Sequence, residues 1–245
     1  MKRLSHIKLY EDWNNRIDES TNPGELKVIY ADKNKGKYQH YKTVVKNPTK
    51  KFDSFKKDFL AHPQKYLTNS KSDFHQPTDG KGTPIPELKI GAFIKIDIVT
   101  IMTAFVKVVQ LYETADGILH ATFVTLEGHP EKGYINFKVS KEGDHDIKFE
   151  ISSFTETNVL APEEFARGEQ KESWISMLKK LPSLLGGTGT PPLFTDISPE
   201  RSKFMADLRK SGGNPNSEVW NNAVSSGHGL IAKNVNKGKD REGRG

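Results

Sequence analysis

The sequence predicts an α+β fold in which an antiparallel sheet packs on one long helix near the C-terminus. Between residues 88 and 155, apolar side chains recur at every second position in short runs separated by turn sequences, which is typical of strands joined by hairpins. The following segment, residues 162–181, instead carries a stripe of apolar residues at helical spacing. An amphipathic helix must bury its stripe, and the open face of the sheet is the available partner.

Before the sheet, the chain is predicted to contain a strand, a helix and two loops. "ELKVIYA" (25–31) is a strand candidate, whereas "DKNKGKYQHYK" (32–42) has the composition of a loop or hairpin tip. "TKKFDSFKKDFLAHPQKYL" (49–67) has helical periodicity, and residues 70–87 are rich in Gly, Pro, Ser, Thr and Asp, as in a loop. The apolar face of the helix consists of Phe52, Phe55, Phe59 and Leu60.

Five strands are predicted after residue 88. In "GAFIKIDIV" (91–99), the isoleucines share one face while Lys95 and Asp97 occupy the other, and "TADG" (114–117) supplies an Asp-Gly turn. Short turns of this kind produce an antiparallel meander, for which we expect one buried face and one solvated face. The other four runs are "FVKVVQLYE" (105–113), "ILHATFVTL" (118–126), "YINFKV" (134–139) and "IKFEISSF" (147–154).

The C-terminal third is predicted to contain a long helix and a less ordered extension. Pro162 near the start and lysines in the last turn are typical of helix ends, and Trp174, Met177, Leu178 and Leu181 form the apolar stripe. "PSLLGGTGTPPLFTD" (182–196) has the composition of a linker. "SPERSKFMADLRK" (198–210) indicates a short helix, and we expect a mobile tail from Ser211.

The loop "TLEGHPEKG" (125–133) resembles the signature Thr-Leu-Pro-Gly-His-Pro-Glu-x-Gly of a domain-of-unknown-function family in the START-like (SRPBCC) superfamily, although Glu127 replaces the proline. "FEISSFTETN" and "ARGEQKESWISML" are similar to that family's last strand and terminal helix. The resemblance covers residues 85–181 and implies a helix-grip fold, in which a curved antiparallel sheet wraps a long C-terminal helix. We therefore divide the chain into an N-terminal part packed on the same domain (1–84), the helix-grip core (85–181) and a C-terminal extension (182–245).

The loop allows three interpretations. His129 between Glu127 and Glu131 could act as a general base or contribute metal ligands. It could also be a turn, since glycines permit unusual backbone angles and a residue before proline is held extended. The turn explains more of the residues, so we assign Gly128, Pro130 and Gly133 a structural role and expect no catalytic residue and no metal site. The residues expected to contact a ligand are His129, Glu131, Phe123, Phe137, Phe149 and Trp174.

Composition narrows the possible functions. The chain has no cysteine, which excludes disulfides, thiol nucleophiles and thiolate metal sites. Its longest apolar stretch, "IVTIMTAFV" (98–106), is shorter than the ~18 residues of a membrane helix, so we expect no membrane insertion. The absence of cysteine suits a reducing compartment, and Glu11 and Asp12 disfavour a secretory signal peptide, so we expect a cytoplasmic location. Charge is uneven, because residues 1–84 hold 17 Lys and Arg against 10 Asp and Glu, and residues 201–245 hold 9 against 4.

Three functions remain open. The superfamily resemblance implies a binding protein whose apolar cavity holds a small hydrophobic ligand, without a cofactor. An enzyme using His129 and Glu131 at the cavity mouth is the first alternative, and the sequence leans against catalysis. The second is an interaction or effector protein that binds an acidic partner or nucleic acid through its basic flanks. A nucleic-acid partner is disfavoured because neither base-stacking aromatic residues nor a basic recognition helix is evident. The sequence contains no signal for oligomeric state.

Overall fold

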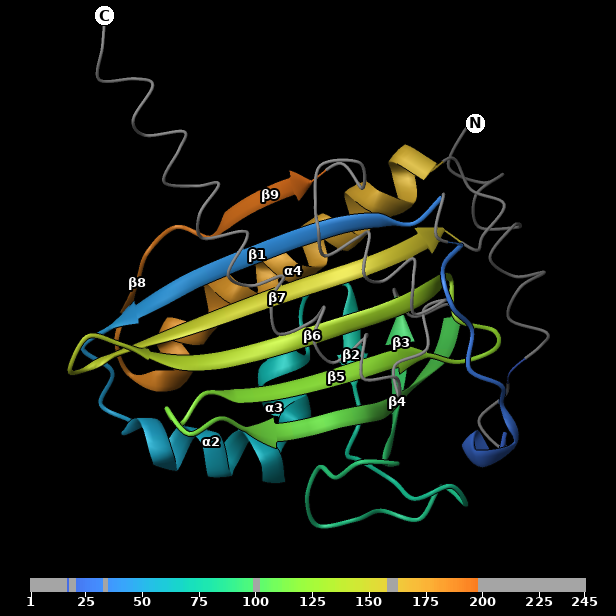
Figure 1. Cartoon of the computed structure of the whole chain (residues 1–245), viewed down its shortest axis with the longest axis horizontal. Coiled ribbons are helices and arrows are strands. Elements are labelled where there is room, and N and C mark those ends of the chain that lie inside the picture. The colour runs from blue at the N-terminus through green and yellow to red at the C-terminus, as the bar shows by residue number, and fades with distance from the viewer. Residues whose placement is uncertain (1–16, 18–20, 33–34, 99–101, 158–162, 198–245) are drawn as a thin grey trace, which may run out of the picture.

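The computed structural model describes residues 17, 21–32, 35–98, 102–157 and 163–197 (Figure 1). These residues form strands, three α-helices and one short 3₁₀ helix. The helices are η1 (Pro23–Glu25), α2 (Phe52–Ala61), α3 (Pro63–Leu67) and α4 (Glu163–Leu185). The strands are β1 (Lys37–Lys46), β2 (Ser72–Phe74), β3 (Phe93–Ile98), β4 (Met102–Glu113), β5 (Leu119–Thr125), β6 (Glu131–Glu142), β7 (Asp146–Thr157), β8 (Thr188–Gly189) and β9 (Leu193–Ile197).

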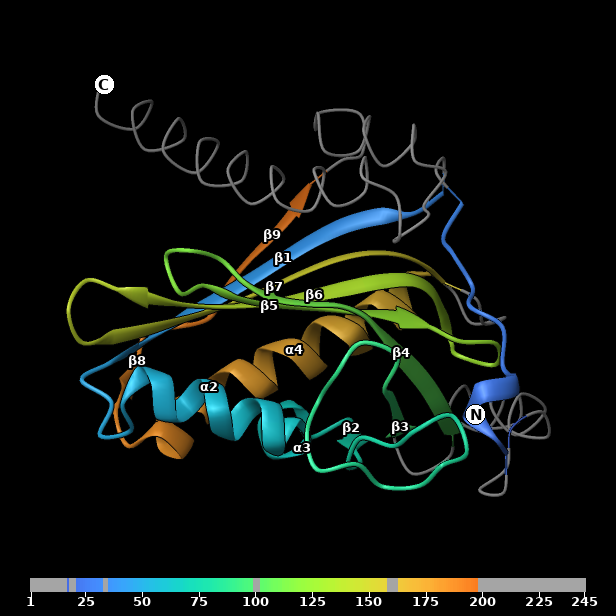
Figure 2. The ribbon, with the colours of Figure 1, turned by 60° about the horizontal axis from the view of Figure 1, so that its bottom comes forward.

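All the strands belong to one antiparallel sheet in the order β2-β3-β4-β5-β6-β7-β1-β8, and β9 also pairs with β1. The sheet is curved, and α4 runs along one of its faces together with α2 and α3 (Figure 2). We call this the inner face and the opposite one the outer face. A curved antiparallel sheet around a long C-terminal helix is the helix-grip fold, so the predicted fold class is confirmed.

The interior between the inner face and the helices is largely aromatic. On α2, Phe55 and Phe59 are fully buried against Tyr66 of α3 and Phe149 of β7, with ring centroids 5.0–6.4 Å apart. On α4, all four residues of the predicted stripe are buried, Trp174 among them. Each large apolar side chain contributes roughly 1.5–3 kcal/mol when buried, so these contacts hold the helices to the sheet.

The N-terminal strand β1 was not predicted. Its residues were interpreted in part as a loop or hairpin tip, but β1 pairs with β7 from Lys37 opposite Thr155 to Val45 opposite Ile147. Polar residues dominate this stretch, and its partner lies more than 100 residues away in the sequence, so no local pattern reveals the pairing. The expected strand at 25–31 is reduced to one isolated bridge between Val28 and Leu126.

The predicted linker at 182–196 is also wrong. Helix α4 continues through Pro182 to Leu185, and the residues beyond it form β8 and β9, which pair with β1. Proline inside a helix removes one backbone hydrogen bond. The buried side chains of Leu181 and Leu185 nevertheless anchor this last turn to the core. The helix predicted at 198–210 and the tail from Ser211 lie outside the described residues.

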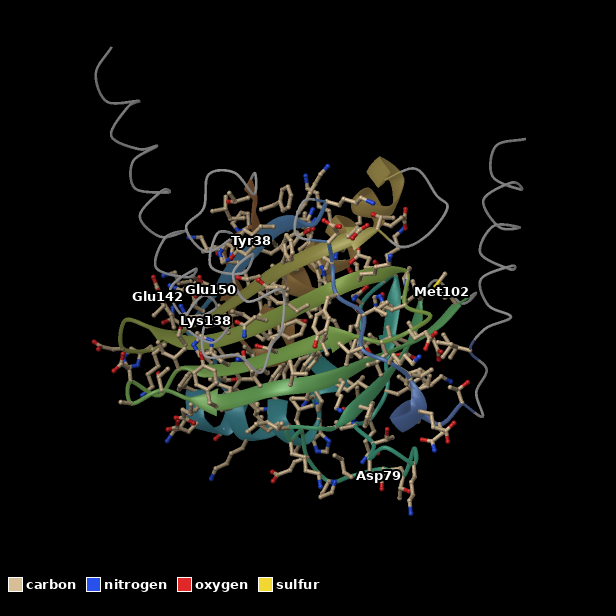
Figure 3. The ribbon with its side chains drawn as sticks, turned by 45° about the vertical axis from the view of Figure 1, so that its right-hand side comes forward. Tyr38, Asp79, Met102, Lys138, Glu142 and Glu150 are labelled. Carbon is tan, nitrogen blue, oxygen red and sulfur yellow. The ribbon has the colours of Figure 1, made fainter. Side chains whose placement is uncertain are left out.

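The outer face of the sheet is not solvated as expected, because its polar residues are buried. His40 Nδ1 lies 3.1 Å from Ser152 Oγ. Lys138 and Glu150 lie close together (Figure 3), and Lys138 Nζ is 3.1 Å from Glu150 Oε2. Hydrogen bonds and ion pairs thus replace water on this face. The buried polar residues of the outer face are His40, Gln110, His120, Thr122, Asn136, Ser140, Glu150 and Ser152.

Candidate functional site

The loop between β5 and β6 is built by backbone hydrogen bonds. The amide of His129 donates to Leu126 O at 3.0 Å, and the amide of Glu127 donates to Lys27 O at 2.7 Å. Gly128 has φ of +85° and Gly133 has φ of +135°, values that side-chain-bearing residues rarely adopt. Both glycines therefore meet a backbone requirement of the turn, and Pro130 separates His129 from the first residue of β6.

The imidazole of His129 faces the backbone of its own loop. Its Nδ1 lies 3.0 Å from the amide nitrogen of Glu131, and the side chain is buried. Burial lowers the pKa of His129 to about 4, so the ring is neutral at pH 7 and Nδ1 can accept the Glu131 N–H. A general base works best with a pKa near the operating pH, so this environment does not favour acid–base chemistry by His129.

The carboxylate of Glu131 connects the loop to the long helix. It is buried and accepts a hydrogen bond from Gln170 Nε2 of α4. Glu127, in contrast, is exposed, so the three acidic and imidazole groups of the loop do not converge. Within the described part of the chain, no three His, Asp or Glu side chains lie close enough together to hold a metal ion.

The four aromatic residues expected to contact a ligand meet on the inner face. The ring of Phe137 lies 5.1 Å from that of Phe123, 6.2 Å from that of Phe149 and 5.7 Å from that of Trp174, measured between centroids. All four are buried in the main hydrophobic core. They pack against one another at the centre of this core.

Three polar residues at one end of this interior were missed by sequence analysis or assigned no polar role. Ser153 of β7 follows Phe149 and Ile151 on the inner face, while Gln170 and Trp174 lie one turn apart on α4. Ser153 Oγ, Gln170 Oε1 and Trp174 Nε1 are buried and have no hydrogen-bond partner among the described residues. A serine that continues the inward alternation of "IKFEISSF" was the available sequence signal.

These three atoms flank the same half of β6. Gln170 donates a hydrogen bond to Glu131, which begins β6. Ser153 lies opposite Ile135 in the β6–β7 pairing. Two residues further along, the ring of Phe137 contacts Trp174. We call Ser153, Gln170 and Trp174 the polar end of the interior. The arrangement offers hydrogen-bonding groups next to aromatic walls.

Known structures resemble this chain at low sequence identity. A START superfamily protein from Mycobacterium smegmatis is 16% identical with a TM-score of 0.41, and the match covers 61% of this chain and 97% of that one. Major latex-like protein 151 from Panax ginseng is also 16% identical, with a TM-score of 0.40 and coverage of 60% and 96%. A norcoclaurine synthase from Thalictrum flavum is 12% identical, with a TM-score of 0.39 and coverage of 61% and 94%. At these identities the likeness concerns the fold alone.

Comparison with curated protein sequences found no match. In the described part of the chain, no helix has the length and apolar character needed to cross a membrane.

A family model described as "Domain of unknown function (DUF1990)" matches residues 37–171. The match begins at β1, earlier than the resemblance recognised in the sequence, and it runs through all strands to β7 and into α4. Since it spans more than half of the sequence, the chain belongs to the DUF1990 family.

Proposed function

We propose that this protein binds a small, largely hydrophobic molecule between the inner face of the sheet and α4. The observation that carries the proposal is the polar end, where Ser153 Oγ, Gln170 Oε1 and Trp174 Nε1 are buried without a partner among the described residues. The helix-grip fold supports it, because its sheet and long helix face each other across a mainly apolar interior.

The energetic cost of the polar end supports a binding role. A buried polar group without a hydrogen bond costs roughly 1–3 kcal/mol, whereas an apolar residue of similar size at the same position costs nothing of this kind. Three such groups flank one half of β6, in an interior that is mostly aromatic and aliphatic. A ligand that formed hydrogen bonds with them would offset this cost on binding.

The aromatic residues would contact the apolar part of the ligand. Phe137 lies at the centre, since its ring approaches those of Phe123, Phe149 and Trp174. Binding sites for small molecules combine such apolar walls with a few polar groups that fix orientation. In this proposal Glu131 positions Gln170 through their hydrogen bond, and His129 holds the loop that carries Glu131.

Native mass spectrometry of the protein purified from its own host tests the proposal. We expect a species heavier than the polypeptide, and loss of that species in the Ser153→Val variant. Ser140→Val is the matched control, because Ser140 is a buried strand serine on the outer face of β6. If the wild-type protein carries no small molecule and no hydrophobic compound raises its melting temperature, interior binding is wrong.

A further inference from the structure

We infer that the ligand presents an uncharged hydroxyl group to the polar end, attached to a flat apolar body, and that it is not a carboxylate. This inference rests on the proposed function and specifies the chemical class of the molecule that the interior accepts. Its basis is the set of hydrogen-bond donors and acceptors that the polar end offers and the shape of the rings beside it.

Trp174 and Gln170 require opposite hydrogen-bonding groups from a ligand. The indole Nε1–H of Trp174 can only donate a hydrogen bond. The amide of Gln170 could in principle present either its oxygen or its nitrogen, but its Nε2 faces the Glu131 carboxylate, which can only accept. This contact fixes the orientation of the amide, and Gln170 Oε1 is therefore an acceptor that needs a donor.

A hydroxyl group can meet both requirements, because it is at once a donor and an acceptor. It accepts the Trp174 N–H through a lone pair and donates its own hydrogen to Gln170 Oε1. The Ser153 hydroxyl can rotate to donate or to accept a hydrogen bond, so it can pair with either a donor or an acceptor of the ligand. A carboxylate could accept from Trp174 and Ser153, but it has no hydrogen to give to Gln170. A carboxylate would also have to leave water for an apolar interior, which is costly for a charged group.

The rings next to the polar end favour a flat body. Trp174 meets Phe137 at an interplanar angle of 70° and Phe74 at 49°, with centroids 5.7 and 6.3 Å apart. Aromatic rings prefer such edge-to-face and tilted contacts, and a flat aromatic ligand would make contacts of the same kind. An aromatic alcohol thus matches the polar end and the walls together.

Three probes of the same shape separate these contributions. Naphthalene provides the flat body alone, 2-naphthol adds an uncharged hydroxyl, and 2-naphthoate adds a carboxylate that is ionised at pH 7. Binding to the full-length protein is followed by the fluorescence of each probe. We expect 2-naphthol to bind at least about tenfold more tightly than naphthalene, and 2-naphthoate to bind more weakly than either.

Variants assign the preference to named atoms. Trp174→Phe removes the N–H but keeps an aromatic ring, and Ser153→Ala removes the second hydroxyl. Each should reduce the ratio of 2-naphthol affinity to naphthalene affinity several-fold. Ser140→Ala on the outer face should change neither affinity. A thermal melt of each variant establishes that it is folded before binding is compared.

The possible failures are distinguishable. If naphthalene binds the wild-type protein as tightly as 2-naphthol, or if 2-naphthoate binds most tightly, the inference about the hydroxyl is overturned while interior binding stands. If the 2-naphthol preference persists in both variants, the polar end is not its source and the inference is also overturned. If none of the three probes binds, the proposed interior site fails together with the inference.

Discussion

Replacing Gly133 with alanine would place a new β-carbon inside the backbone of the neighbouring strand. Gly133 lies on β6 opposite Thr155 of β7, and its φ is +135°. The added β-carbon would lie 2.1 Å from Phe154 O and 3.0 Å from Thr155 Cα. Both atoms belong to a backbone that is paired along its length, so neither can rotate out of the way as a flexible side chain would.

The cost has two parts. Adopting a positive φ costs a residue other than glycine about 1 kcal/mol. Forcing an extra methyl group into a well-packed position costs roughly 1–3 kcal/mol more, because the backbone must shift. We therefore expect Gly133→Ala to lower the free energy of unfolding by about 2–4 kcal/mol. Gly143 is the matched control, since its φ is +64° but an added β-carbon meets no atom within 4 Å. Gly143→Ala should cost only about 1 kcal/mol.

Urea unfolding of the two variants and the wild-type protein measures the difference. The midpoint of Gly133→Ala should fall well below that of Gly143→Ala, with the slope unchanged in all three proteins. Equal midpoints would show that the strand pairing around Gly133 relaxes at little cost, and the argument for a rigid turn would then be refuted.

Three further predictions concern buried polar groups. His129→Ala should lower the free energy of unfolding by about 1 kcal/mol, the worth of its hydrogen bond to the Glu131 backbone, and a thermal melt with unchanged stability would contradict this. Burial lowers the pKa of His40 and of His129 to about 4 from the ordinary 6.5, so the unfolded chain binds more protons between these values. The free energy of unfolding therefore has its full value above pH 6.5 and falls as the pH drops toward 4, by about 2 kcal/mol per histidine between pH 7 and 5. His129→Asn keeps a hydrogen-bond acceptor but does not titrate, so unfolding experiments at a series of pH values should show the loss from one histidine fewer. Lys138→Met leaves the Glu150 carboxylate buried beside one cation fewer and should lower the free energy of unfolding by about 3 kcal/mol. The double variant Lys138→Met, Glu150→Leu should recover most of that loss. Equal losses in the single and the double variant would disprove the pairing.

Local patterns predicted those parts of the fold that depend on neighbours in sequence. Alternating residues identified the meander, and Trp174 with its stripe identified α4, because burial of one face sets the period of each element. Strand β1 escaped detection because its stability comes from β7, and because polar residues interrupt the apolar ones on both of its faces. The C-terminal strands were missed for the same reason, since they exist through pairing with β1.

In the candidate site too, some residues could be predicted from the sequence and others could not. Phe123, Phe137 and Phe149 were placed together because each lies at an inward position of a strand, which the alternation makes visible. Ser153 occupies such a position too, but a serine in a strand usually reaches solvent or a partner, and its isolation depends on what surrounds it in three dimensions. The role of Gln170 depends on a contact with Glu131, 39 residues earlier, which sequence spacing does not reveal.

The position of β1 inside the sheet has a consequence for synthesis of the chain. Lys37 pairs with Thr155, so β1 leaves the ribosome 118 residues before the end of its main partner is made. At roughly 5–20 residues per second, β1 waits about 6–24 s with both edges unpaired. The hairpins from β3 to β7 can close one after another during this interval, since each strand finds its partner next in the sequence. Once β7 is made it can pair with the waiting β1, and β8 and β9 pair with β1 later still. A nascent chain stalled before Asp146 would expose β1 as an open edge to other chains.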